Sequence, residues 1–147
     1  MKLSRASTYA VYGLSYLAGQ PDRLVPLSEI RSRCGLPEKH LAKIFQILVR
    51  SGHLKAARGA RGGFALAKPA ELVSALDIIR LVDGPVRSEK CPIHPAAAEG
   101  APCCPISQMV FEGREKMSAV FRSVTLAQLA KASVGRNPSP PQAFDHT

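Results

Sequence analysis

Residues 39–70 read KHLAKIFQILVRSGHLKAARGARGGFALAKPA, and this stretch decides the fold. It begins with the spacing of an amphipathic helix and ends with the glycine-rich pattern of a β-hairpin. It holds seven positive side chains and no acidic one. The seven are Lys39, Lys43, Arg50, Lys55, Arg58, Arg61 and Lys68. A helix with a basic outer face followed by a basic hairpin is the form of a winged helix that binds DNA.

The first half of the stretch predicts a helix that starts at Leu36-Pro37-Glu38 and ends near Ser51-Gly52. Proline suits the first helical position, and an acidic side chain is favourable at the positive end of the helix dipole. The predicted core stripe is Leu41, Ile44, Phe45 and Leu48. A second, polar face carries Lys39, Lys43, Gln46 and Arg50, and His40 lies beside it. We expect this face to enter the major groove, where polar side chains reach base edges and phosphates.

The second half predicts two short strands, Leu54–Arg58 and Phe64–Leu66, joined by Gly59-Ala60-Arg61-Gly62-Gly63. The three glycines allow positive φ angles and a tight reversal. Arg58 and Arg61 would then meet phosphates or a narrow minor groove, which attracts arginine. The glycines, Gly62 among them, let the backbone approach the duplex closely.

The flanking sequence completes a helix-turn-helix before the hairpin. We expect a first helix over residues 7–19, a short strand over 25–27, and a second helix over 28–33 that ends at Gly35. Cys34 falls in the apolar phase and is predicted to be a buried small side chain. After the hairpin, Ser74-x-x-Asp77 predicts a capped helix.

From Ile106 a long helix is predicted, with a coiled-coil-like seam that suits pairing with a second helix. The seam consists of Met109, Gly113, Met117, Val120 and Val124. A short helix capped by Thr125-x-x-Gln128 follows. The fold class is therefore mainly α with a small β wing. The expected organisation is a winged helix-turn-helix domain (1–84), a cysteine-containing loop (85–105), a dimerisation helix with a short final helix (106–134) and a disordered tail (135–147).

The positive charge of the chain is concentrated in its N-terminal part. Of the net charge of +9, residues 1–90 carry +8, from 15 Lys and Arg against 7 Asp and Glu. Residues 91–147 carry +1, from 5 against 4. This asymmetry favours a polyanion as the partner of the N-terminal part, and the helix and hairpin indicate that the polyanion is double-stranded DNA.

Two other classes are not indicated. No apolar run is long enough to cross a membrane and no signal-peptide pattern begins the chain, so we expect a cytoplasmic protein in which cysteines are reduced, metal-bound or redox-active. The sequence holds no C-x-x-C at a helix start, no phosphate-binding loop and no evident carboxylate pair, so we do not expect an enzyme.

Several motifs resemble the IscR/NsrR family of bacterial winged-helix regulators over about residues 1–133. They are Tyr9-Ala10-Val11, Leu41-x-x-Ile44-Phe45-x-x-Leu48, Arg58-Gly59-Ala60-Arg61-Gly62-Gly63-Phe64-x-Leu66 and Thr125-Leu126-Ala127-x-Leu129. The resemblance implies a homodimeric transcription factor, usually a repressor, whose long helix forms the dimer interface. It also implies that the cysteine loop can hold an iron–sulfur cluster, either 2Fe-2S or 4Fe-4S.

The resemblance also implies which residues would bind the cluster. In the family's loop, three cysteines are separated pairwise by five residues. Cys91 and Cys103 match the outer two, and Ala97 stands at the middle position. Cys104 is additional and His94 is a further candidate ligand.

Chemistry alone leaves other readings of this loop open. Three cysteines and one histidine (Cys91, His94, Cys103 and Cys104) match the donor set of a zinc site. The Cys-Pro pairs at 91–92 and 104–105 could each supply a thiolate to haem, and the thiols could act alone through oxidation. In each case, the order of the loop would set the separation of the two DNA-reading units in a dimer, and so the affinity for the operator.

Overall fold

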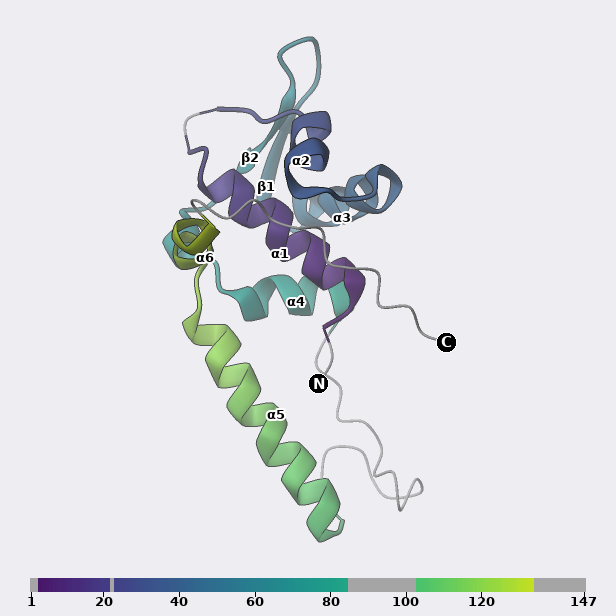
Figure 1. The fold of residues 1–147 in the computed structure, drawn as a ribbon, viewed down its shortest axis with the longest axis vertical. Coiled ribbons are helices and arrows are strands. Elements are labelled where there is room, and N and C mark those ends of the chain that lie inside the picture. Colours follow the sequence, from purple (N-terminus) through teal and green to yellow (C-terminus); the bar gives the residue numbers. More distant parts are fainter. Residues whose placement is uncertain (1–2, 22, 85–102, 134–147) are drawn as a thin grey trace.

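The computed structural model describes residues 3–21, 23–84 and 103–133 (Figure 1). Most of the predicted cysteine loop (85–102) and the predicted disordered tail (135–147) lie outside the described residues. The elements are α1 (Arg5–Ala18), α2 (Leu27–Cys34), α3 (Glu38–Arg50), β1 (Leu54–Ala57), β2 (Gly63–Leu66), the 3-10 turn η1 (Ala70–Leu72), α4 (Ala75–Asp83), α5 (Pro105–Ser123) and α6 (Leu126–Ser133). Mostly helical structure with a two-stranded antiparallel sheet confirms the predicted fold class.

Helix α1 is the central element, and it contacts α2, α3, α4, α6 and β2 (Figure 1). It starts two residues before the predicted start because Ser4 is its N-cap: the Ser4 hydroxyl accepts a hydrogen bond from the Ser7 N–H at 3.0 Å. Its inward face buries Ala10, Leu14 and Leu17.

Helices α2 and α3 form the predicted helix-turn-helix. Gly35 ends α2 in the left-handed conformation, with a φ of 63°. Pro37 is the N-cap of α3 and not its first helical residue, so α3 begins one residue later than expected. The predicted core stripe of α3 is confirmed, because Leu41, Ile44, Phe45 and Leu48 are all buried.

Strands β1 and β2 form the wing, and Leu54 pairs with Leu66 while Ala57 pairs with Gly63. The strand predicted over residues 25–27 is reduced to Val25, which forms an isolated bridge with Phe64, and α2 already begins at Leu27. The bridge places Val25 beside β2, on the edge that β1 leaves open.

The prediction that all three glycines of the wing adopt positive φ angles is wrong. Only Gly59 has a positive φ, of 108°. A Cβ on Gly62 would lie 2.4 Å from the Ala57 carbonyl oxygen, and one on Gly63 would lie 2.6 Å from the Val25 backbone. The last two positions therefore require glycine for close backbone contact and not for backbone dihedral angles.

Three helices, α4, α5 and α6, follow the wing in the chain. The predicted capping box of α4 is present, with the Asp77 N–H donating to the Ser74 hydroxyl at 3.2 Å. Helix α5 extends away from the other elements (Figure 1), and α6 packs back on α1, where Leu126 is fully buried. The predicted Thr125–Gln128 cap of α6 is present. Among the described residues, no helix has the length and apolar character needed to span a membrane.

Candidate nucleic-acid interface

The polar face of α3 is directed away from the core. All five predicted contact residues of this helix are exposed: Lys39, His40, Lys43, Gln46 and Arg50. The opposite face of the helix is held in the core by its four buried apolar side chains. Because both faces belong to one rigid helix, burial of the apolar stripe fixes the direction of the polar one.

The first turn of α3 is held by two neighbours. The ring of His40 meets the ring of Tyr9 from α1, with centroids 6.5 Å apart and an interplanar angle of 60°. Arg31 at the end of α2 forms an ion pair with Glu38 at 2.6 Å. Glu38 is therefore engaged with α2, which leaves the neighbouring lysines as the charged groups of this helix face.

The wing adds more cations. Arg58 and Arg61 are exposed in the loop between β1 and β2, and Gly62 closes that loop by donating its N–H to the Gly59 carbonyl at 2.9 Å. Within the described parts of the chain, the ion pairs are Arg23–Glu29 and Arg31–Glu38. The cations of α3 and the wing (Lys39, Lys43, Arg50, Lys55, Arg58 and Arg61) thus have no acidic partner there.

The wing is attached to α3 by an aromatic contact. The Phe64 ring of β2 meets the Phe45 ring of α3 edge to face, with centroids 5.0 Å apart and an interplanar angle of 85°. Phe45 is fully buried, so this contact joins the wing to the core of the helix-turn-helix.

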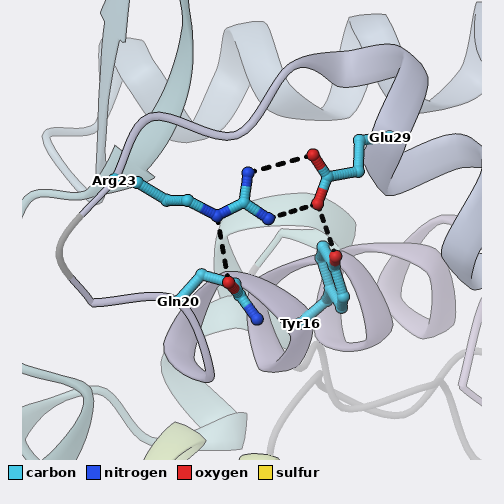
Figure 2. A network of polar contacts seen from close by, with 4 residues as sticks. All are labelled: Tyr16, Gln20, Arg23 and Glu29. Carbon is cyan, nitrogen blue, oxygen red and sulfur yellow. Dashed lines mark hydrogen bonds and ion pairs between the residues drawn. The ribbon is translucent and has the colours of Figure 1, made fainter.

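Sequence reasoning missed a polar network that supports α2 (Figure 2). The Tyr16 hydroxyl donates to Glu29 Oε1 at 2.6 Å, Arg23 donates Nη1–H to Glu29 Oε2 at 3.0 Å, and a second Arg23–Glu29 bond completes the pair. Arg23 Nε–H donates to Gln20 at 3.0 Å. The hydrogen bond from Arg23, followed by the one from Tyr16, lowers the pKa of Glu29 to about 2. The partners are 6 and 13 residues apart across a loop, a spacing that no local sequence pattern indicates.

Of the predicted metal ligands, Cys103 and Cys104 are described, and Cys91 and His94 lie outside the described residues. Cys104 is the N-cap of α5, and its Sγ accepts the Ser107 N–H at 3.5 Å. The Ser107 hydroxyl lies 3.7 Å from Cys103 Sγ. The part of the chain that the structure describes contains no group of three or more metal-binding side chains.

Cys34 is buried between α2 and α3, as predicted for a small apolar side chain. Burial raises the pKa of its thiol to about 11. At neutral pH this thiol is protonated, which makes it a packing residue and a poor nucleophile.

A winged helix-turn-helix that presents exposed cations on its third helix and its wing defines a DNA-binding regulator. The model of the Rrf2 family, described as an iron-dependent transcriptional regulator, matches residues 3–132, and this chain belongs to that family. Members of the family are transcription regulators and not enzymes, in agreement with the sequence expectation.

Solved structures of similar proteins agree with this assignment. CymR, the global cysteine regulator of B. subtilis, is 26% identical with a TM-score of 0.74, over 90% of this chain and 98% of that one. The oxidised form of Staphylococcus aureus CymR is 28% identical with a TM-score of 0.71, over 89% and 97%. T. potens IscR is 27% identical with a TM-score of 0.71, over 90% and 88%. The expected resemblance to IscR-type regulators is confirmed.

Proposed function

We propose that this chain is a homodimeric transcriptional repressor that binds operator DNA through α3 and the wing. Lys39, His40, Lys43, Gln46 and Arg50 enter the major groove, and Arg58, Arg61 and Gly62 approach the backbone or the minor groove. The observation that carries the proposal is the set of exposed cations on α3 and the wing that no described acidic residue neutralises. Phosphates are the ligands that such a set binds best.

Dimerisation is proposed through α5. Met109 is 72% exposed and Val120 is 59% exposed, although both are apolar. Large exposed apolar side chains on one helix face indicate a partner surface. The proposed units are accordingly 1–84 for DNA binding, 85–105 for sensing and 106–134 for dimerisation, with the tail at 135–147.

The sensor is proposed to be an iron–sulfur cluster held by Cys91 and Cys103, with Cys104 and His94 as the further candidates. The two described thiols fit such a group chemically, because both lie at the N-terminus of α5, where an anionic thiolate is favoured. A bound cluster would supply sensitivity to redox state. The alternative is a regulator without a cluster, which uses these thiols directly or binds zinc.

The chain itself offers a route from the thiols to the DNA-binding unit. Helix α5 directly follows the two cysteines, and the carbonyl of its C-cap residue, Val124, accepts the Ala75 N–H at 2.8 Å. The Leu126 N–H donates to the Val73 carbonyl at 2.9 Å. We propose that a displacement at the N-terminus of α5 reaches the start of α4 through these hydrogen bonds.

DNA binding can be tested with duplexes selected from a random library by the purified protein. Fluorescence anisotropy would then compare the wild type with Lys43→Ala and Arg61→Ala. Each variant should bind more weakly, and the slope of log K against log salt should fall by about 1 if the side chain contacts one phosphate. Lys131→Ala, an exposed lysine on α6, is the matched control and should bind as the wild type does. Unchanged affinity and slope for both test variants would contradict the proposed interface.

The sensor is tested separately on protein purified without oxygen. Iron and acid-labile sulfide in near-equal amounts per chain would support a cluster, and Cys91→Ser and Cys103→Ser should remove both. Stoichiometric zinc, or no metal, would support the alternative regulator. Cys34→Ala is the control, since that thiol is buried in the hydrophobic core and should not alter metal content.

A further inference from the structure

Helix α2 has little apolar surface with which to hold its place. Only Ile30 and Cys34 of its eight residues are buried. Its position therefore depends on polar contacts to a larger degree than that of α3, which buries four large side chains. Glu29, in the first turn of α2, accepts the hydrogen bonds from Tyr16 of α1 and from Arg23 of the preceding loop (Figure 2).

The same loop supports the wing. Two residues after Arg23, Val25 exchanges both backbone hydrogen bonds with Phe64 of β2, each at 2.9 Å. The neighbouring Gly63 has no room for a Cβ against the Val25 backbone, so the two segments are in direct contact. On its other side, Phe64 packs against Phe45 of α3. The wing is thus in contact with both this loop and α3.

We propose that the Tyr16–Glu29–Arg23 network positions the wing relative to α3. Tyr16 is a positioning residue: its hydroxyl fixes Glu29 and, through Arg23, the loop that ends in the Val25–Phe64 bridge. Simultaneous contact of α3 and the wing with one duplex requires a fixed spacing between them, because a small displacement of either removes its contacts. The inference rests on the proposed DNA-binding function and assigns this role to a residue of α1, outside α3 and the wing.

The bidentate geometry of the Arg23 pair makes this arrangement effective. A guanidinium that donates two bonds to one carboxylate fixes orientation as well as distance. The side chains are partly exposed, at 45% for Arg23 and 29% for Glu29, so the pair contributes little to global stability. Its effect is expected in the placement of the loop more than in the free energy of unfolding.

The test uses the full-length protein and a duplex selected by the wild type. Tyr16→Phe removes only the hydroxyl and should weaken binding about threefold to tenfold, the range expected for the net contribution of one ordinary hydrogen bond. Tyr12→Phe is the matched control on the same helix, because the Tyr12 hydroxyl has no hydrogen-bond partner among the described residues and the side chain is 37% exposed. It should bind as the wild type does.

A double-mutant cycle separates positioning from general destabilisation. If Tyr16 acts through the wing, Arg61→Ala should cost less affinity in the Tyr16→Phe background than in the wild type. Hydrogen exchange of the Val25 and Phe64 amides should also be faster in Tyr16→Phe without DNA. Additive losses, or unchanged affinity together with unchanged exchange at these amides, would overturn the inference. Failure of the wild type to select any duplex would overturn the proposed function, and the inference with it.

Discussion

Gly63 and Val25 are in contact through their backbones. A Cβ on Gly63 would lie 2.6 Å from both the carbonyl carbon and the carbonyl oxygen of Val25, closer than real side chains approach a backbone. This contact places the second wing strand against the loop that precedes α2. The glycine-rich hairpin thus has a structural requirement that is separate from any contact with DNA.

Gly63→Ala should therefore disturb the contact between β2 and the loop that precedes α2. Neither backbone segment can yield as a flexible side chain would, so we expect a loss of about 1–3 kcal/mol in the free energy of unfolding. Urea denaturation measures this loss, and DNA affinity should fall with it. Gly19→Ala is the control, since its Cβ would meet the Tyr16 carbonyl at an ordinary 3.4 Å. Equal stability of the two variants would show that the Val25 contact adjusts without cost.

The thiols should differ sharply in reactivity. Cys34 is 2% exposed and its pKa is raised to about 11, so its thiolate fraction at pH 8 is about one thousandth. Cys103 is exposed at the start of α5. In reduced, metal-free protein, iodoacetamide should modify Cys34 roughly 100-fold more slowly than Cys103. Peptide mass spectrometry over time gives both rates, and addition of denaturant should bring them together. Rapid labelling of native Cys34 would mean that the α2–α3 contact opens readily.

His53 should make stability depend on pH. Burial, followed by the charge of Lys68, lowers the pKa of its imidazole, whereas the Ser51 carbonyl and Asp77 act in the opposite direction. Arg80 lies in the same hollow. Because the folded state binds its proton less readily than the unfolded state, stability from this group is present above the unfolded pKa and is lost as pH falls through the folded pKa.

The corresponding measurement is urea denaturation at pH 7.5 and pH 5.5. The wild type should lose stability at the lower pH, and His53→Gln should lose less, because glutamine does not titrate. Both of these pH values lie above the range in which Glu29 and Asp77 take up protons, because the pKa values of these two carboxyl groups are lowered. An identical pH dependence in the two proteins would exclude His53 as its source.

Local patterns predicted those parts of the molecule that depend on neighbours in sequence. The 3.6-residue period identified the buried stripe of α3, and the Ser74–Asp77 pair identified the start of α4. The exposure of Lys43 and Arg50 follows from that stripe, because a helix that buries one face must expose the other. The fold and the charge distribution of the proposed DNA interface could be predicted in this way.

Contacts between segments that are distant in the sequence could not be predicted from local patterns. Nothing in the sequence pairs Tyr16 with Glu29, or Val25 with Phe64, since such contacts depend on how α1, the loop and the wing pack. The positive φ expected at three wing glycines is found at Gly59 alone, because backbone proximity and not dihedral freedom governs the others. Tertiary packing decides each of these cases.

The seam on α5 gives the last prediction. Met109 and Val120 are exposed in the single chain, so a glutamate at either position should leave the folded monomer intact. In a symmetric dimer each substitution appears twice at the interface. Since burial of one large apolar side chain is worth about 1.5–3 kcal/mol, Met109→Glu or Val120→Glu should raise the dimer dissociation constant roughly 100-fold or more. Sedimentation velocity over a concentration series measures this shift.

Ala119→Glu provides the control for this experiment. Ala119 is exposed on α5 and lies next to Val120 in sequence, but a helix turns by about 100° per residue and directs it away from the seam. This variant should dimerise as the wild type does, although it carries the same added charge. Weaker DNA binding should accompany only the seam variants, because a monomer can occupy only one half-site. If the seam variants and the control sediment alike, α5 does not form the dimer interface.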